Sequence, residues 1–253
     1  MTIRWIVGRT GTGKTEWVKQ SVIEKLKQDP LGDPIIIIVP DQLSYSMERG
    51  LTIEAGLGGV ARAEVLTFKR LAWRILQQEG GITRKEVDPF GYTMLIRSIL
   101  EEEKEQLQLF QKAANAFGFT ELVARMMQEF ERYAIDVPKL EQLIVYLKES
   151  GASPTTIQKM EDLYRIATKM AERLGTTYID REGYLRLLEE VIASSSYVRK
   201  ASIYIDGFQS FTEREYLIIE QLLLQAKEVV CTIPLDPFHE TSDLFYDGAM
   251  MYD

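Results

Sequence analysis

The stretch that decides the fold lies near the amino terminus: Ile3-Arg4-Trp5-Ile6-Val7, followed by Gly8-Arg9-Thr10-Gly11-Thr12-Gly13-Lys14-Thr15. The first five residues predict a β-strand, and residues 16–27 after the glycine-rich turn predict a helix. The turn matches the pattern G-x-x-x-x-G-K-[ST], which in a strand–turn–helix context is a P-loop. A glycine-rich turn that matches by chance is the alternative, and the flanking strand and helix argue against it.

The spacing of the motif suits a polyphosphate ligand. A backbone that wraps phosphates closely favours glycine where a Cβ would obstruct it or where φ is positive, as expected at Gly8, Gly11 and Gly13. N–H groups at the start of the helix then face the phosphates. We expect Lys14 to reach the β- and γ-phosphates and the Thr15 hydroxyl to hold Mg²⁺. The predicted ATP-binding residues are Gly8, Arg9, Thr10, Gly11, Thr12, Gly13, Lys14 and Thr15.

Composition bounds the class of protein. The chain has 253 residues, 45% of them hydrophobic and 27% charged, which is typical of a soluble globular protein with one large or two modest domains. The net charge of -8 argues against coating nucleic acid through bulk charge, although a local basic groove stays open. Cys231 is the single cysteine, so an internal disulfide or a multi-cysteine metal site within this chain is excluded.

The sequence also bears on location. It begins without a signal peptide, and no apolar run approaches the length of a membrane span. We therefore expect a cytoplasmic protein that does not enter a membrane. His239, the one histidine, is assigned no role.

Strand and helix patterns alternate through the first eighty residues, which predicts an α/β fold with an open, mostly parallel sheet. Ligands of such sheets lie at the carboxyl ends of the strands, where the P-loop, Pro40–Gln42 and Thr67–Arg70 would meet. The predicted elements are a buried strand over 35–39, a helix over about 44–55, a turn over 57–59, a strand over 64–68 and a helix over 69–79.

The middle of the chain changes character. Residues 84–175 give no strand signal, and their apolar residues repeat at helical spacing, as in Leu122, Val123, Met126 and Met127. We therefore predict a wholly helical insertion over 84–175 within a discontinuous α/β lobe formed by 1–83 and 176–253. The charged run Glu101–Glu105 is interpreted as a solvated face or a helix end.

The α/β pattern returns after the insertion. Thr212 and Glu215 form a capping-box signature at the start of the last predicted helix. The predicted elements are a helix over 184–193, a strand over 202–206, a helix over 212–225 and a strand over 228–233 that stops at Pro234.

A P-loop needs a partner carboxylate on a neighbouring strand to orient Mg²⁺, and Asp206 at the end of its strand has that form. We predict Thr15 and Asp206 as the Mg²⁺ residues. The alternatives are that Asp206 is only a turn residue, or that Glu213 or Glu215 supplies the carboxylate. Fast NTPases place a glutamate directly after this aspartate, whereas this chain has Gly207, which predicts nucleotide binding with slow or no hydrolysis.

Four segments in order resemble the AddB family, which contributes the second subunit of bacterial AddAB ATP-dependent helicase–nucleases. The resemblance implies the first RecA-like lobe of a superfamily 1 helicase, with an insertion like domain 1B. Residues 178–185 are similar to the region that leads back into the motor lobe. The segments are Gly8–Thr15, Ile38-Val39-Pro40-Asp41-Gln42, Arg62–Arg74 with the core Thr67-Phe68-Lys69-Arg70-Leu71-Ala72-Trp73, and Tyr204-Ile205-Asp206-Gly207-Phe208.

The resemblance carries functional expectations. The family processes double-stranded DNA ends for recombinational repair, with an AddA-type motor subunit as the partner in a heterodimer. The AddB member resembles an inactivated helicase that recognises the Chi sequence in single-stranded DNA. ATP and Mg²⁺ are the implied cofactors, while the family's iron–sulfur cluster and nuclease site lie further downstream and are not in this chain. We therefore expect an amino-terminal fragment that is a weak or inactive ATPase without nuclease activity.

Two departures from superfamily 1 motors accompany the resemblance. The glutamine-containing segment that reads adenine would precede the first strand, so base specificity stays open. The arginine finger of a second RecA-like lobe is absent from these residues.

The resemblance also points to DNA-binding residues. Thr67, Phe68, Lys69 and Arg70 match a segment that lies near single-stranded DNA in related motors. Phe68 could stack on a base while Lys69, Arg70 and Arg74 meet phosphates. In the alternative, Phe68 belongs to the core and the basic residues are ordinary surface residues.

Two interpretations from other classes stay open. A stand-alone small-molecule kinase with a helical lid would need phosphate-binding arginines in the lid, and the arginines there follow no recognisable motif. A non-catalytic interaction module would keep the P-loop only as a structural turn. Turnover that depends on a small-molecule acceptor would favour the kinase, and nucleotide binding without turnover or DNA contact would favour the interaction module.

Overall fold

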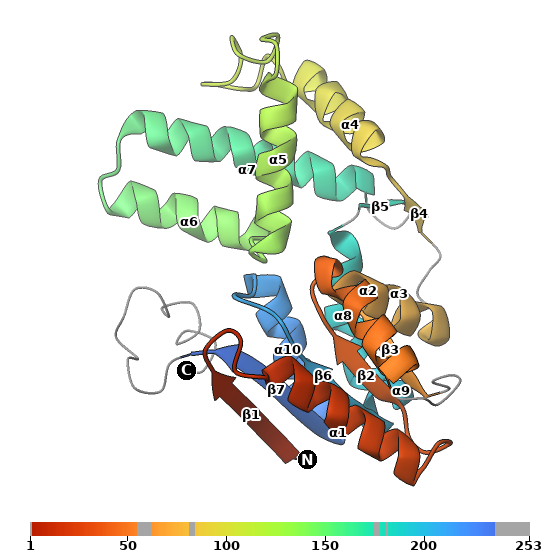
Figure 1. Cartoon of the computed structure of the whole chain (residues 1–253). Helices are drawn as coiled ribbons and strands as arrows, with labels where there is room; N and C mark the ends of the chain where they lie inside the picture. Colours follow the sequence, from red (N-terminus) through yellow and green to blue (C-terminus); the bar gives the residue numbers. More distant parts are fainter. Residues whose placement is uncertain (1, 55–61, 81–83, 175–177, 181, 236–253) are drawn as a thin grey trace. The chain divides into compact units, whose positions relative to one another are not determined.

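The computed structural model describes residues 2–54, 62–80, 84–174, 178–180 and 182–235 (Figure 1). The chain divides into two compact units, one joining Met1–Gly80 to Leu187–Asp253 and the other spanning Gly81–Arg186. We call them the α/β unit and the helical unit, and the predicted insertion 84–175 lies within the second. The predictions for Ala55, 57–59, Arg181, His239 and the tail beyond 235 lie outside the described residues.

The described part of the α/β unit contains a five-stranded sheet whose neighbouring strands are all parallel. The strand order is β1-β7-β6-β2-β3 (Figure 1). This confirms the predicted α/β fold with a mostly parallel sheet. The strands are β1 (Thr2–Gly8), β2 (Ile35–Ile38), β3 (Ala63–Leu66), β6 (Ser202–Ile205) and β7 (Glu228–Pro234).

Both faces of the sheet are covered. Ile35 and Ile37 of β2 pack with Val18 of α1 and with Tyr204 in one buried cluster, whereas Ile36 and Ile38 project from the opposite face and are equally buried. Such burial on both faces explains the uninterrupted β-branched run in the sequence. The helical segments are α1 (Lys14–Gln28), α2 (Asp41–Arg49), η1 (Gly50–Glu54), α3 (Phe68–Glu79), α8 (Gly183–Val191), η2 (Ile192–Ser194), α9 (Ser196–Lys200) and α10 (Glu213–Gln225).

Several predicted boundaries are corrected. The strand predicted over 64–68 ends at Leu66, because the Thr67 side chain accepts a hydrogen bond from the Arg70 N–H and caps α3. Phe68 is therefore the first residue of a helix. The helix predicted from about Ser44 begins at Asp41 and continues as the π-helical segment η1. Helix α9 was not predicted, since five residues are too short to show a period.

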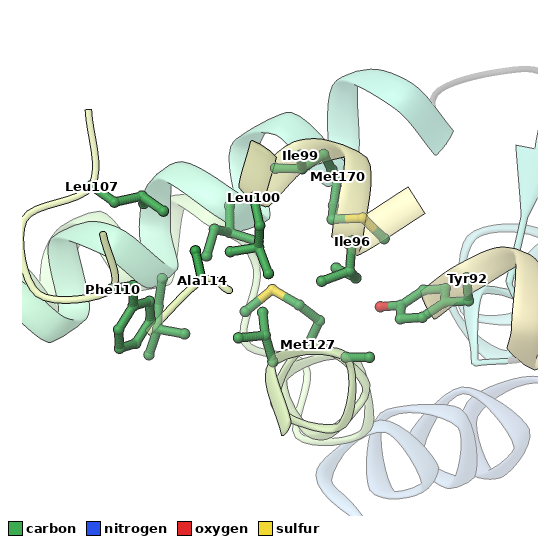
Figure 2. Close-up of a cluster of buried hydrophobic side chains, with 13 residues drawn as sticks. Tyr92, Ile96, Ile99, Leu100, Leu107, Phe110, Ala114, Met127 and Met170 are labelled. Atoms are coloured by element: carbon green, nitrogen blue, oxygen red, sulfur yellow. The ribbon is translucent and has the colours of Figure 1, made fainter. Parts of the chain in front are cut away.

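The helical unit packs four helices around one apolar cluster. Figure 2 shows Ile96 and Leu100 of α4 close to Met127 of α5, with Met170 of α7 beside them. The described helices are α4 (Pro89–Glu102), α5 (Phe119–Arg132), α6 (Val137–Glu149) and α7 (Pro154–Leu174).

This unit is not wholly helical, which corrects the prediction. Strand β4 (Lys85–Glu86) pairs in parallel with β5 (Tyr178–Ile179), and the Val87 N–H donates to the Ile179 carbonyl at 2.8 Å. Two exposed polar residues give no strand pattern, so the pairing could not be predicted. In the described ranges, no helix is both long and apolar enough to cross a membrane.

A buried carboxylate holds the segment between α4 and α5. Asp162 of α7 is 2% exposed and accepts hydrogen bonds from the backbone N–H groups of Gln108, Leu109 and Phe110, each at 2.8 Å. Glu103, at the end of α4, is also buried and pairs with Arg165 at 3.2 Å. The interpretation of 101–105 as a helix end therefore holds at Glu102, but Glu103 does not lie on a solvated face.

Candidate functional site

The turn Gly8–Thr15 joins β1 to α1 at the carboxyl edge of the sheet. Gly11 and Gly13 have φ of 84° and 88°, and Gly13 is the N-cap of α1. A Cβ on Gly8 would lie 2.7 Å from Thr12 Oγ1, which itself donates to the Arg9 carbonyl at 2.8 Å. Positive φ at two positions and a close approach at the third explain the glycine at each.

Lys14, the first residue of α1, extends back over this turn. Its Nζ donates to the carbonyl oxygens of Gly8 at 2.5 Å and Arg9 at 2.9 Å. Burial lowers the pKa of Lys14, and the negative charge of Asp206 partly opposes that shift. Asp206 is therefore electrostatically coupled to the lysine of the motif, although the two residues are far apart in the sequence. Thr15 follows in the first turn of α1, where its side chain is exposed.

Asp206 follows β6 directly and is 1% exposed. Its Oδ1 accepts a hydrogen bond from Thr232 Oγ1 at 2.6 Å, whereas its Oδ2 is buried and has no hydrogen-bond partner among the described residues. A buried carboxylate oxygen without a donor is costly unless a cation or another ligand approaches it. Because Mg²⁺ prefers oxygen ligands, Asp206 fits the predicted metal residue better than it fits a plain turn residue.

Gly207 leaves no room for a general base after Asp206. Its φ is 83°, a conformation that side chains disfavour, and a Cβ there would lie 2.4 Å from Leu43 Cδ1. Glu215 is engaged elsewhere, because its carboxylate accepts from the Thr212 N–H at 2.8 Å in the predicted capping box. Of the predicted alternatives to Asp206, Glu215 is therefore accounted for as a helix cap.

The predicted DNA-binding residues lie at and after the start of α3. Thr67 is buried, and its hydroxyl caps the helix. Phe68 is 4% exposed, and its ring centroid lies 5.4 Å from that of Phe208 and 6.2 Å from that of Phe211. The structure thus places Phe68 in the core, which is the alternative that the sequence left open, and its ring is not available for stacking in this conformation.

The basic residues of α3 differ from one another. Arg70 pairs with Glu48 at 3.2 Å on the surface. Arg74 binds both carboxylate oxygens of Glu64, with Nε 3.1 Å from Oε2, and the Tyr197 hydroxyl donates to the same carboxylate at 3.0 Å. Glu64 therefore holds Arg74 against β3, so Arg74 is the poorer of the two for a phosphate. The structure places Lys69 on the same helix without testing its role.

Two residues of interest were missed by sequence reasoning. Trp73 of α3 is 50% exposed and lies three and four residues after Arg70 and Lys69, so the three share one helix face. An aromatic residue at helical spacing after two basic residues was the available signal. Thr232, on β7, hydrogen-bonds to Asp206, and no motif marked it.

These features define a class, namely a parallel α/β protein whose candidate site lies at the carboxyl ends of β1 and β6. Comparison with known proteins identifies the family. The family model "ADDB, N-terminal" matches residues 5–253, so the chain belongs to the AddB amino-terminal family.

Curated relatives agree with this assignment, and each of them is named as the second (B-type) subunit of an ATP-dependent helicase/deoxyribonuclease. The chain is 47% identical over 253 residues to the relative from Lysinibacillus sphaericus, covering 99% of this chain and 22% of the relative. The relatives from Anoxybacillus flavithermus and Bacillus subtilis are 41% and 36% identical, covering 96% and 93% of this chain and 21% and 20% of the relatives. The chain thus spans about a fifth of the length of these relatives.

Proposed function

We propose that this chain is the amino-terminal, nucleotide-binding lobe of an AddB-type helicase–nuclease subunit, a RecA-like P-loop lobe that carries a 1B-like insertion. It binds ATP with Mg²⁺ and hydrolyses it weakly or not at all. The observation that carries the proposal is the buried Asp206 carboxylate, which has one oxygen without a partner in the described structure and is coupled to Lys14 of the motif. A purely structural turn would leave that buried oxygen unexplained.

In this proposal each part of the site has a separate task. The N–H groups of the Gly8–Thr15 turn and the start of α1 bind the phosphates, and Lys14 moves from the loop carbonyls to the terminal phosphates. Thr15 and Asp206 would hold Mg²⁺, which neutralises phosphate charge when bound. The lack of a side chain at Gly207 denies the attacking water a base, which accounts for weak hydrolysis.

The role of the whole protein is also a proposal. Names of the relatives support a subunit that works with a partner in an ATP-dependent helicase and deoxyribonuclease. We assign the partner to an AddA-type motor subunit and the substrate to double-stranded DNA ends in the cytoplasm, with Chi read from the emerging single strand. The acidic chain, with a net charge of -8, requires a local rather than a global DNA-binding surface.

The α3 face with Lys69, Arg70 and Trp73 is our candidate for that surface, because it combines an exposed ring with cationic side chains. Trp73→Ala should weaken binding of labelled single-stranded DNA about tenfold, since stacking on an aromatic side chain contributes about 1–3 kcal/mol per base. Trp17→Ala, at a partly exposed tryptophan of α1, is the matched control. Equal affinities for the two variants would remove Trp73 from the surface.

The nucleotide proposal is tested by titrating a fluorescent ATP analogue with Mg²⁺ into the chain and into Lys14→Ala. We expect saturable binding that Lys14→Ala weakens at least about a hundredfold, because a charge-assisted contact with phosphate is lost. Phosphate release should stay near background. An absence of saturable binding by the folded wild-type chain would contradict the proposal, and turnover that depends on a small-molecule acceptor would favour a kinase instead.

A further inference from the structure

Thr232 controls the direction in which the Asp206 carboxylate points. Ile205 of β6 pairs with Cys231 of β7, so the next residues, Asp206 and Thr232, stand side by side at the carboxyl edge. Side chains alternate along a strand, and both therefore project from the same face as Tyr204, which packs against α1. The register alone brings the hydroxyl to the carboxylate.

The contacts of the Thr232 hydroxyl are fully specified. It is buried at 2% exposure and donates its one proton to Asp206 Oδ1 at 2.6 Å, a length typical of a hydroxyl bound to an ionised carboxylate. Its oxygen also accepts from the Gly207 N–H at 3.4 Å. With Oδ1 held in this way, rotation of the carboxylate is restricted, and Oδ2 stays the oxygen without a partner in the described structure.

We infer that Thr232 is a positioning residue, which holds Asp206 so that Oδ2 faces the metal-bound nucleotide of the proposed site. The inference rests on the proposed function and adds a specific role for a residue on the strand between β1 and β6. A hydroxyl that merely satisfied a buried carboxylate would affect stability alone. A positioning hydroxyl affects the part of nucleotide binding that depends on Mg²⁺.

The two roles are separated by Thr232→Val, which keeps the shape and removes the hydroxyl, and Thr232→Ser, which keeps the hydroxyl. The dissociation constant of a fluorescent ATP analogue is measured for each with Mg²⁺ and again with EDTA. Thr232→Val should weaken binding with Mg²⁺ about tenfold, as for other residues that orient a metal ligand, and leave binding in EDTA unchanged. Thr232→Ser should restore binding to within about twofold of wild type.

A second readout does not depend on nucleotide fluorescence. Mn²⁺ bound in the presence of ADP, measured by electron paramagnetic resonance, should fall in Thr232→Val and not in Thr232→Ser. When Asp206→Asn is already present, Thr232→Val should cause no further loss, because the two residues act through one carboxylate. If Thr232→Val does not fold, as judged by circular dichroism, Thr232→Ala takes its place with the same expected result.

The outcomes distinguish this inference from the proposal beneath it. A Mg²⁺ dependence in Thr232→Val equal to that of wild type would overturn the positioning role and leave the nucleotide site standing. Failure of the folded wild-type chain to bind nucleotide in a Mg²⁺-dependent way would overturn the proposed function and this inference with it.

Discussion

The two units bury carboxylates in different ways. Asp162 of the helical unit has both oxygens engaged by three backbone N–H groups, whereas Asp206 of the α/β unit has one oxygen engaged and one without a partner in the described structure. Both side chains are at most 2% exposed. Burial alone therefore does not separate structure from function. The state of the hydrogen bonds does, because an unsatisfied buried oxygen costs stability unless a ligand compensates for it.

The largest effect that tests this comparison is expected at Asp162. Asp162→Ala should lower the free energy of unfolding of the helical unit by about 2–4 kcal/mol, because it leaves three backbone N–H groups without acceptors. Far-ultraviolet circular dichroism in denaturant would measure the shift. Trp5, Trp17 and Trp73 all lie in the α/β unit, so tryptophan fluorescence should report an unchanged transition there.

The matched control for that variant is Glu161→Ala. Glu161 is the preceding residue and pairs with Lys148 at 2.7 Å, but it is more exposed. The control should cost less than about 1 kcal/mol, as for other surface ion pairs. Equal losses for the two variants would show that the backbone bonds of Asp162 are not what holds the segment.

Asp180 sharpens the comparison, since it is a buried carboxylate of the helical unit with a shifted pKa. Burial, reinforced by the charge of Glu131, raises the pKa of Asp180 to about 6, against the opposing effects of the Gly183 N–H and Arg186. The buried Tyr92 and Glu182 also lie close enough to interact, since the charges of Asp180 and Glu182 both raise the pKa of Tyr92. Protonation of Asp180 is therefore more favourable in the folded state than in the unfolded chain.

The sign of the pH effect follows from that shift. The stability contributed by the bound proton is present below the ordinary pKa near 3.8 and is lost as the pH rises through about 6. Asp180→Asn should therefore gain about 1–2 kcal/mol on wild type between pH about 4.5 and pH about 7. Denaturant unfolding at both pH values measures this, with Asp136→Asn at the exposed cap of α6 as the control. An identical pH dependence in wild type and Asp180→Asn would contradict it.

The smallest effect on stability is expected at Asp206. Asparagine still accepts the Thr232 hydrogen bond and removes a buried charge, so Asp206→Asn should change the free energy of unfolding by less than about 1 kcal/mol. Tryptophan fluorescence in denaturant would measure it. A loss as large as that of Asp162→Ala would mean that Asp206 is a structural carboxylate.

Local patterns allowed much of the α/β unit to be predicted. The buried β-branched run gave β2, the glycine spacing gave the turn before α1, and the Thr212–Glu215 capping box is confirmed at the start of α10. Each of these signals lies within a few consecutive residues. Propensity and capping therefore act at the scale that a sequence displays directly.

Other features depend on contacts between distant residues. Phe68 is buried because Phe208 and Phe211, after β6, pack against it, and no local pattern reports that. The bond from Thr232 to Asp206 needs the register of β6 against β7, and strand β4 is too short and too polar to predict. The orphaned oxygen of Asp206, which carries the functional proposal, likewise became visible only in three dimensions.

The central claim is that Asp206 is kept for a ligand and Asp162 for the fold. It is tested most directly by measuring the affinity of a fluorescent ATP analogue, with Mg²⁺ and with EDTA, in wild type, Asp206→Asn and Asp162→Asn. We predict that wild type and Asp162→Asn bind more tightly with Mg²⁺, and that Asp206→Asn loses about tenfold or more of that gain while binding in EDTA is unchanged. Full Mg²⁺ dependence in Asp206→Asn would contradict the account.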